Sequence, residues 1–325
     1  MGFENMKTKK LSIIVPFFNE ETNIPRIVHE ALTVFASALS SYSFEIILMD
    51  NHSTDGSFMV ACAQAQKHPE IKVIRLSRNF GYQANILTGY LHCTGDAAVQ
   101  LDADGEDDPV LIADLVREWE AGHQVVYGIR RKREEGFFIR FQRAIFYRIL
   151  RSLSSIPIPV DAGDFRLVDR KVIEVLRLCR ESNPYLRGLI SFAGYQQKGI
   201  PYDRRPRYDG KSKFSWWDYF SLALDGITSF SKKPLAIASW LGLLFSLTSF
   251  LGAVFYFLFH FLVGTKLPGF TTLILVNLFL AGIQLLCFGI IGTYIGRIFD
   301  ETKSRPRSLV EATYPTDLKG VGHVS

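Results

Sequence analysis

The sequence predicts an α/β domain with a mostly parallel sheet, followed by a pair of membrane-spanning helices. Over about the first 130 residues, short apolar segments rich in β-branched residues alternate with helical segments, which is the pattern of βαβ units. Residues 234–265 and 267–296 contain no Asp, Glu, Lys or Arg. Each is long enough for about 45 Å of helix, which can cross a hydrocarbon core of about 30 Å. The positive mean hydropathy of +0.12 fits this concentration of apolar residues.

The predicted elements of the first domain follow in order. Strands are expected at 11–18, 44–50, 72–77, 98–101 and 124–129. Helices are expected at about 22–39, in a segment after residue 57 that ends at about 67, and at about 82–92. Such a sheet has both faces covered by helices. Open α/β sheets bind ligands beyond the carboxyl ends of their strands, so we expect the functional residues there.

An acidic segment follows the fourth predicted strand. Asp102 and Asp104 stand two residues apart, and Pro109 is a favourable first residue for the next helix. Two carboxylates in this position suit Mg²⁺ or Mn²⁺, which bind a few protein oxygens and let substrate phosphates supply others. A solvated acidic turn is the alternative. A calcium-binding loop is excluded because Asp107 stands where glycine is required and Ala113 where a bidentate glutamate is required.

Composition excludes several other classes of site. The chain contains neither G-x-x-x-x-G-K-S/T nor G-x-G-x-x-G, so a nucleotide would be held through carboxylates and a metal. The four cysteines have no paired spacing, which disfavours disulfides and zinc and fits a reducing compartment. A net charge of +5 without a basic face disfavours nucleic-acid binding. The polar N-terminus does not read as a signal peptide.

Charges around the apolar segments predict the topology. The loop between them carries only Lys266, and the flanks carry Lys232, Lys233, Arg297, Lys303, Arg305 and Arg307. By the positive-inside rule, we expect an integral protein of the cytoplasmic membrane with its first domain and both termini in the cytoplasm. The expected parts are a catalytic domain (1–214), an interfacial helix (215–231), two spans within 232–300 (about 235–262 and 270–296) and a cytoplasmic tail (301–325).

The expected interfacial helix precedes the first span. Trp216, Phe220, Leu224 and Ile227 fall at helical spacing on one face, close to Lys232 and Lys233. This pattern is typical of a helix lying on a membrane surface, and an amphipathic core helix is the alternative.

Six motifs together resemble a known family. They are Val-Pro-Phe-Phe-Asn-Glu (15–20), Asp-Asn-His-Ser-Thr-Asp-Gly-Ser (50–57), Arg-Asn-Phe-Gly (78–81), Asp-Ala-Asp (102–104), Asp-Ala-Gly-Asp-Phe-Arg-Leu (161–167) and Arg-Tyr-Asp-Gly-Lys-Ser-Lys-Phe (207–214). Their order and spacing resemble the inverting family 2 glycosyltransferases, whose fold is the Rossmann-like GT-A fold. The last two motifs and the membrane hairpin look like the polyisoprenyl-phosphate glycosyltransferases, which include dolichol-phosphate mannose synthases and bactoprenol glucosyltransferases. The resemblance extends to about residue 303.

This resemblance implies a nucleotide-sugar site, with Asp50 accepting a hydrogen bond from a uracil or guanine ring. In this chain Asn51 and His52 stand where the family more often has Asp-Gly. The implied nucleotide-sugar-binding residues are Pro16, Asn19, Glu20, Asp50, Asn51, Ser53, Asp55, Asn79, Gly81, Asp102 and Ala103.

The resemblance also implies a metal and cations for the diphosphate. Asp102 and Asp104 correspond to the ligands of Mg²⁺ or Mn²⁺, and Glu106 either adds a third ligand or begins the turn. Asp164 either acts as a weak base or orients Arg166. The implied catalytic residues are Asp104, Asp164 and Arg130, and the implied phosphate-binding residues are Arg130, Arg207, Lys211 and Lys213.

The implied activity is transfer of one sugar from a nucleotide sugar to polyprenyl (undecaprenyl) phosphate, with inversion at the anomeric carbon. UDP-glucose is the favoured donor. The alternatives are a dolichol-phosphate-mannose-type or aminoarabinose-type transferase, a processive polysaccharide synthase, and a non-catalytic membrane subunit. The resemblance further implies a homo-oligomer, a tetramer.

Overall fold

The computed structural model describes residues 8–131, 162–205, 231–263 and 269–315, and the structural statements below concern these residues. The predicted interfacial helix falls almost wholly in the segment 206–230, outside the described residues. Arg207, Lys211 and Lys213 lie in the same segment.

Eight strands form one sheet in the order β7-β5-β6-β4-β1-β2-β3-β8. β6 and β8 are antiparallel to their neighbours, and the other six strands share one direction. The predicted α/β fold with a mostly parallel sheet is therefore confirmed. The strands are β1 (Lys10–Phe17), β2 (Ser43–Asp50), β3 (Ile71–Leu76), β4 (Ala97–Gln100), β5 (Val125–Arg130), β6 (Ala162–Asp169), β7 (Gln197–Tyr202) and β8 (Val310–Tyr314).

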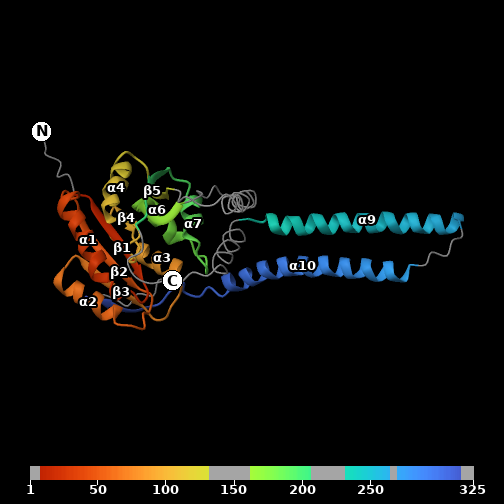
Figure 1. The fold of residues 1–325 in the computed structure, drawn as a ribbon, viewed down its shortest axis with the longest axis horizontal. Coiled ribbons are helices and arrows are strands. Elements are labelled where there is room, and N and C mark those ends of the chain that lie inside the picture. The colour runs from red at the N-terminus through yellow and green to blue at the C-terminus, as the bar shows by residue number, and fades with distance from the viewer. Residues whose placement is uncertain (1–7, 132–161, 206–230, 264–268, 316–325) are drawn as a thin grey trace. The chain divides into compact units, whose positions relative to one another are not determined.

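Helices cover both faces of this sheet (Figure 1). One face is buried by apolar side chains of α1, such as Ile24, Ile27 and Val28, at the spacing of one helical stripe. On the other face, α3 packs so closely on β1 that a Cβ at Gly89 would lie 2.4 Å from Cγ2 of Ile14. The helices are α1 (Ile24–Ser37), α2 (Ser57–Lys67), α3 (Tyr82–His92), α4 (Ile112–Glu120), α6 (Arg170–Leu178) and α7 (Leu186–Phe192), with a 3₁₀ turn at Pro109–Leu111.

The polar tail after the second apolar segment contains a strand that its sequence did not predict. β8 pairs antiparallel with the edge strand β3 and belongs to the same compact unit as the other strands. The Ser77 amide donates to the Leu309 carbonyl at 2.9 Å, and the hydroxyls of Thr88 and Ser308 lie 2.6 Å apart. The tail thus covers an edge that would otherwise expose unpaired backbone groups.

A second unit contains the two apolar helices, α9 (Lys233–Val263) and α10 (Phe270–Thr302). Large apolar side chains such as Trp240 and Phe250 are exposed along them. Phe245 of α9 and Phe279 of α10 make an edge-on ring contact at 6.1 Å, as in a hairpin. By length and composition, both helices could cross a membrane.

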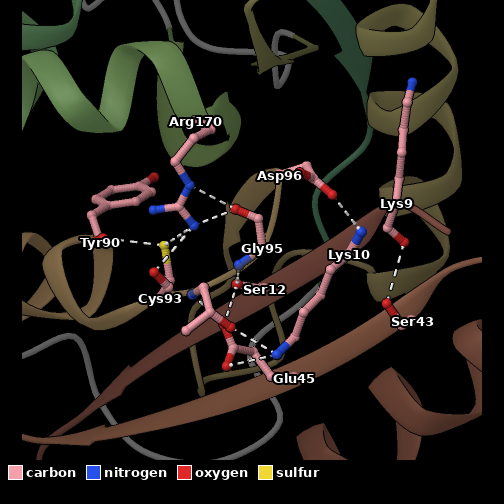
Figure 2. A network of polar contacts seen from close by, with 11 residues as sticks. Lys9, Lys10, Ser12, Ser43, Glu45, Tyr90, Cys93, Gly95, Asp96 and Arg170 are labelled. Atoms are coloured by element: carbon pink, nitrogen blue, oxygen red, sulfur yellow. Dashed lines mark hydrogen bonds and ion pairs between the residues drawn. The ribbon is translucent and has the colours of Figure 1, made fainter. Parts of the chain in front are cut away.

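A network of polar contacts closes the amino ends of the strands (Figure 2). The Glu45 carboxylate on β2 accepts hydrogen bonds from the Ser12 hydroxyl at 2.6 Å and from the Thr94 amide at 2.6 Å. The Lys10 ammonium donates to its second oxygen at 3.4 Å. Arg170, at the start of α6, donates to the carbonyls of Gly95 and Cys93.

Candidate active site

Polar side chains gather at the opposite edge, where six strands have their carboxyl ends and β6 begins. Asp50 ends β2, Arg130 ends β5 and Tyr202 ends β7, while Asp102 and Asp104 follow β4. Most of the residues that the sequence analysis selected lie in these strand ends. The parallel order of the strands therefore assembles the candidate site.

The loops after β1 and β2 hold each other in place. The Asn19 amide donates to the Ser53 hydroxyl at 3.0 Å, and the Glu20 amide donates to the Ser57 hydroxyl at 2.8 Å. Asn19 has a φ of 56° and His52 has a φ of 63°, a left-handed conformation that Asn adopts more readily than most residues. Such backbone, held by neighbouring bonds, is typical of functional sites.

Asp50 is fully buried and only half satisfied. Its Oδ1 accepts from the Ser53 amide at 2.8 Å, but its Oδ2 has no hydrogen-bond partner in the described part of the chain. The Arg75 Nε lies 3.7 Å from Oδ2. Burial raises the pKa of Asp50, and the hydrogen bonds from Ser53 oppose this rise. The open oxygen is an acceptor available to a ligand N–H.

Two asparagines join the ends of β2 and β3. The Asn51 side chain donates to Asn79 Oδ1 at 2.9 Å and accepts from the Phe80 amide at 3.0 Å. Asn79 Oδ1 also accepts from the Gly81 amide at 2.9 Å, and Gly81 has a φ of 90°. The structure therefore brings together Asn51, Asn79 and Gly81, as the sequence analysis expected.

The D-x-D segment lies beside α3. Asp102 Oδ1 accepts from the Tyr82 hydroxyl at 2.6 Å and from the side-chain amide of Gln100 at 2.8 Å. Asp104 Oδ1 accepts from the Glu106 amide at 3.1 Å, and Gly105 between them has a φ of 71°. Burial and the nearby carboxylates of Asp107 and Asp104 raise the pKa of Asp102 well above its ordinary value.

The acidic turn is clamped by the end of β7. The Tyr202 hydroxyl donates to Asp107 Oδ1 at 2.5 Å, Arg204 pairs with Glu106, and Arg205 pairs with Asp108. The Arg205 amide donates to the Glu106 carbonyl at 2.9 Å. The Glu106 carboxylate thus already faces a guanidinium, and its role as a metal ligand stays a prediction.

Asp164 on β6 is paired with an arginine that the sequence analysis did not select. Arg187 of α7 donates to both Asp164 oxygens, at 2.8 and 2.9 Å. Arg166 lies 3.7 Å from Asp164 and donates to the Gly163 carbonyl instead. Burial would raise the pKa of Asp164, but the Arg187 guanidinium outweighs it and holds that pKa below its usual range.

Arg130 ends β5 and feels the charges of two carboxylates, Asp107 and Asp102. Burial alone would lower its pKa, but a hydrogen bond with Tyr202 and the charges of Asp107 and Asp102 raise it. Its Nε has no hydrogen-bond partner in the described chain. A half-buried guanidinium with an open donor suits a phosphate oxygen.

The residues fit a hard divalent cation whose other ligands come from the substrate. No group of three or more His, Cys, Asp or Glu that could hold a metal occurs among the described residues. Asp102 and Asp104 supply two carboxylates, and burial together with the nearby charges of Asp107 and Asp104 raises the pKa of Asp102, a cost that a bound cation would offset. Mg²⁺ and Mn²⁺ accept one or two protein carboxylates together with phosphate oxygens.

Some selected residues serve local structure. Pro16 lies within β1, Ala103 is buried, and the Asp55 carboxylate accepts from the Ser57 amide at the start of α2. Seven polar residues of the candidate site were not predicted from the sequence, because each stands outside the six motifs. They are Arg75, Tyr82, Arg187, Tyr202, Arg204, Arg205 and Glu311.

Several known proteins are similar to this chain. The family model "Glycosyl transferase family 2" matches residues 12–177. An uncharacterized glycosyltransferase, YkcC, of Bacillus subtilis is 38% identical over 95% of each chain. The bactoprenol glucosyl transferase of Shigella phage SfX is 36% identical over 93% of this chain and 99% of its own length. Among solved structures, the mannosyltransferase PcManGT of Pyrobaculum calidifontis, in complex with GDP-Man and Mn²⁺, is 17% identical with a TM-score of 0.49, covering 92% of this chain and 87% of its own.

Proposed function

The chain belongs to glycosyl transferase family 2, and on that premise we propose that it transfers one sugar from a nucleotide sugar to a polyprenyl phosphate. The observation that carries this proposal is its similarity to a bactoprenol glucosyl transferase over 93% of the chain, well beyond the family domain. The name of that relative makes glucose our favoured sugar, and we propose UDP-glucose as its donor.

The base and the diphosphate of the donor each find residues of suitable chemistry in the site. The open Oδ2 of buried Asp50 can accept a hydrogen bond from a base N–H, and the next residue, Asn51, is held by Asn79. Leaving such a donor and acceptor unpaired costs about 1–3 kcal/mol, which favours a base with an N–H at this position. Arg130 has an open donor for the diphosphate.

Asp102 and Asp104 would hold Mg²⁺ or Mn²⁺ at the diphosphate. The bound ion would act as a Lewis acid that stabilises negative charge on the departing nucleoside diphosphate. The Tyr82 hydroxyl and the Gln100 amide orient Asp102, and the clamp from Tyr202, Arg204 and Arg205 holds the turn that follows.

The reaction needs no enzyme nucleophile. A lipid phosphate is an anion near neutral pH, and one of its oxygens forms a bond to the anomeric carbon as the bond to the nucleoside diphosphate breaks. The attack comes from the face opposite the nucleoside diphosphate, which departs with the electron pair of the broken bond, so the configuration inverts. The lowered pKa of Asp164 keeps it ionised beside Arg187, which suits an orienting role better than that of a base.

We further propose that α9 and α10 anchor the enzyme in the cytoplasmic membrane. β3 precedes α9 in the chain and β8 follows α10, yet the two strands are paired. They must lie on the same side of a membrane, which requires an even number of crossings, and two helices supply it. The lysines and arginines around the helices favour the cytoplasm for that side.

Cysteine labelling tests this topology. In intact cells, a cysteine replacing Thr265 between the helices should react with an impermeant thiol reagent, and one replacing exposed Lys303 should react only after lysis. The wild-type protein serves as the control, because it shows how much label the four native cysteines take up. The reverse pattern would separate the site from cytoplasmic nucleotide sugars and overturn the proposed location.

Transfer itself is tested with radiolabelled nucleotide sugars and undecaprenyl phosphate. We expect lipid-extractable label from UDP-glucose above that from other donors, and a β-linked product from the α-linked donor. Label from another sugar would correct the donor alone. Absence of label with every donor, from protein that is folded and supplied with Mg²⁺ or Mn²⁺, would overturn the proposed function.

A further inference from the structure

The tail strand β8 brings one charged side chain to the candidate nucleotide site. Along β3, Arg75 pairs with Ala312 but Leu76 pairs with Val310, so Glu311 is the extra residue of a β-bulge. Bulges next to active sites redirect a side chain that regular pairing would place elsewhere. Here the redirected side chain is the carboxylate of Glu311.

Glu311 contacts two residues that border the base-binding end of the site. Its Oε2 lies 3.1 Å from the Arg75 Nε and 3.4 Å from His52 Nδ1. His52 immediately follows Asn51, and Arg75 stands beside Asp50 in the β2–β3 register. A residue that follows both apolar helices in the chain therefore reaches the site formed by β2 and β3.

Arg75 is shared between two carboxylates. Its Nε donates to Glu311 at 3.1 Å and lies 3.7 Å from Asp50 Oδ2, too far for a hydrogen bond. Its Nη2 lies 3.4 Å from the Ser53 carbonyl, and its guanidinium stacks over the Phe58 ring at 4.7 Å. These contacts hold Arg75 at a distance from which it attracts Asp50 without occupying its open oxygen.

We propose that Glu311 is a positioning residue for nucleotide recognition, acting through Arg75 to keep Asp50 Oδ2 free for the base. This inference rests on the proposed function, because it assigns the open oxygen to a nucleobase. Without the carboxylate of Glu311, the guanidinium of Arg75 has one strong partner left. It then moves toward Asp50 and competes with the N–H of the base.

The test compares nucleotide binding by full-length wild-type protein and the Glu311→Gln variant in detergent. Calorimetry with UDP and GDP, each with Mn²⁺, measures the Kd without any transfer reaction. Glu311 is 48% exposed, so we expect a modest rise of about two- to fivefold in the Kd. Pyrophosphate has no base, and its affinity should stay unchanged. In transfer assays, KM for the donor should rise while kcat does not.

Two controls separate positioning from general stability. Glu174→Gln removes a carboxylate that pairs with Arg170 and Arg177 on α6 and is 52% exposed, and it should leave the nucleotide Kd unchanged. In an Arg75→Gln background, Glu311→Gln should have no further effect, because the competing guanidinium is gone.

Three results would overturn the inference alone, given nucleotide binding by the wild-type protein. These are an unchanged Kd in Glu311→Gln, an equal loss for pyrophosphate, and an equal loss in the Arg75→Gln background. Absence of UDP and GDP binding by the wild-type protein would instead overturn the proposed function, and this inference with it.

Discussion

Glu45 and Asp50, near opposite ends of β2, differ in how fully their carboxylates are hydrogen-bonded. At the amino end, both oxygens of Glu45 accept hydrogen bonds (Figure 2). At the carboxyl end, Asp50 Oδ2 and Asp107 Oδ2 are buried without a hydrogen-bond partner among the described residues. A satisfied carboxylate stabilises the fold, whereas an unsatisfied one lowers stability and is available to a ligand. We therefore distinguish a structural end of the sheet, at Glu45, from the proposed binding end, at Asp50.

The largest effect should come from Asp104→Asn at the binding end. Removing this charge weakens metal binding with little change in side-chain volume, so we expect kcat to fall by about 100-fold or more. Thermal unfolding should be unchanged. Stripping the wild-type protein with EDTA should have the same effect, reversed by Mg²⁺ or Mn²⁺. Full activity of the stripped protein would remove the metal from the mechanism.

The next largest effect should come from breaking the Asp164–Arg187 pair. Arg187→Lys loses one of two parallel hydrogen bonds, and we expect kcat to fall by about 10- to 100-fold. Because Arg187 lowers the pKa of Asp164, its weaker replacement should move the acid limb of the rate profile to higher pH. Asp164→Asn separates the two roles, since a near-complete loss of activity would favour a direct role for this carboxylate.

Asp50→Asn should affect binding more than folding. The variant removes a buried charge that is only half satisfied, so its unfolding midpoint should be equal to or above that of the wild type. It also removes the acceptor proposed for the base, and the donor KM should rise about tenfold. A clear loss of stability would mean that Asp50 belongs with the structural end of the sheet.

The smallest effect on catalysis should come from Glu45→Gln at the structural end. We expect kcat and KM to stay unchanged while the free energy of unfolding falls by about 1–3 kcal/mol. Burial would raise the pKa of Glu45, but hydrogen bonds from Ser12 and Thr94 lower it overall. Stability from this group is present above its ordinary pKa and is lost as pH falls through the lowered value. The difference in unfolding midpoint should therefore be larger at neutral pH than in acid.

The sequence predicted which residues lie at the proposed binding end, but it did not predict which side chains contact one another there. Strand ends are marked by apolar segments followed by polar residues, so the positions of Asp50 and Asp102 could be found from pattern alone. The pairing of Asp164 with Arg187 could not, because Arg187 comes from α7, which no motif identifies. Long-range ion pairs depend on how helices pack, and local patterns carry no information about this.

The strand β8 shows a second limit. Its five residues, Val310–Tyr314, are too few for an alternating pattern to stand out, and its pairing with β3 joins segments more than 200 residues apart. The two apolar helices were predicted readily because their signal is long and local. The same chain therefore offers a strong signal for its two long apolar helices and almost none for the strand that returns to the sheet.

That returning strand sets an order for folding during synthesis. β1, β2 and β3 leave the ribosome long before β8, and α9 and α10 must be made in between. Until then the edge of β3 carries unpaired backbone groups, the kind of edge that leads to aggregation. Pairing of this edge with β8, and the contact of Glu311 with Arg75, can form only after α9 and α10 have been synthesised. A chain truncated after α10 would leave the ribosome with the backbone groups at the edge of β3 still unpaired.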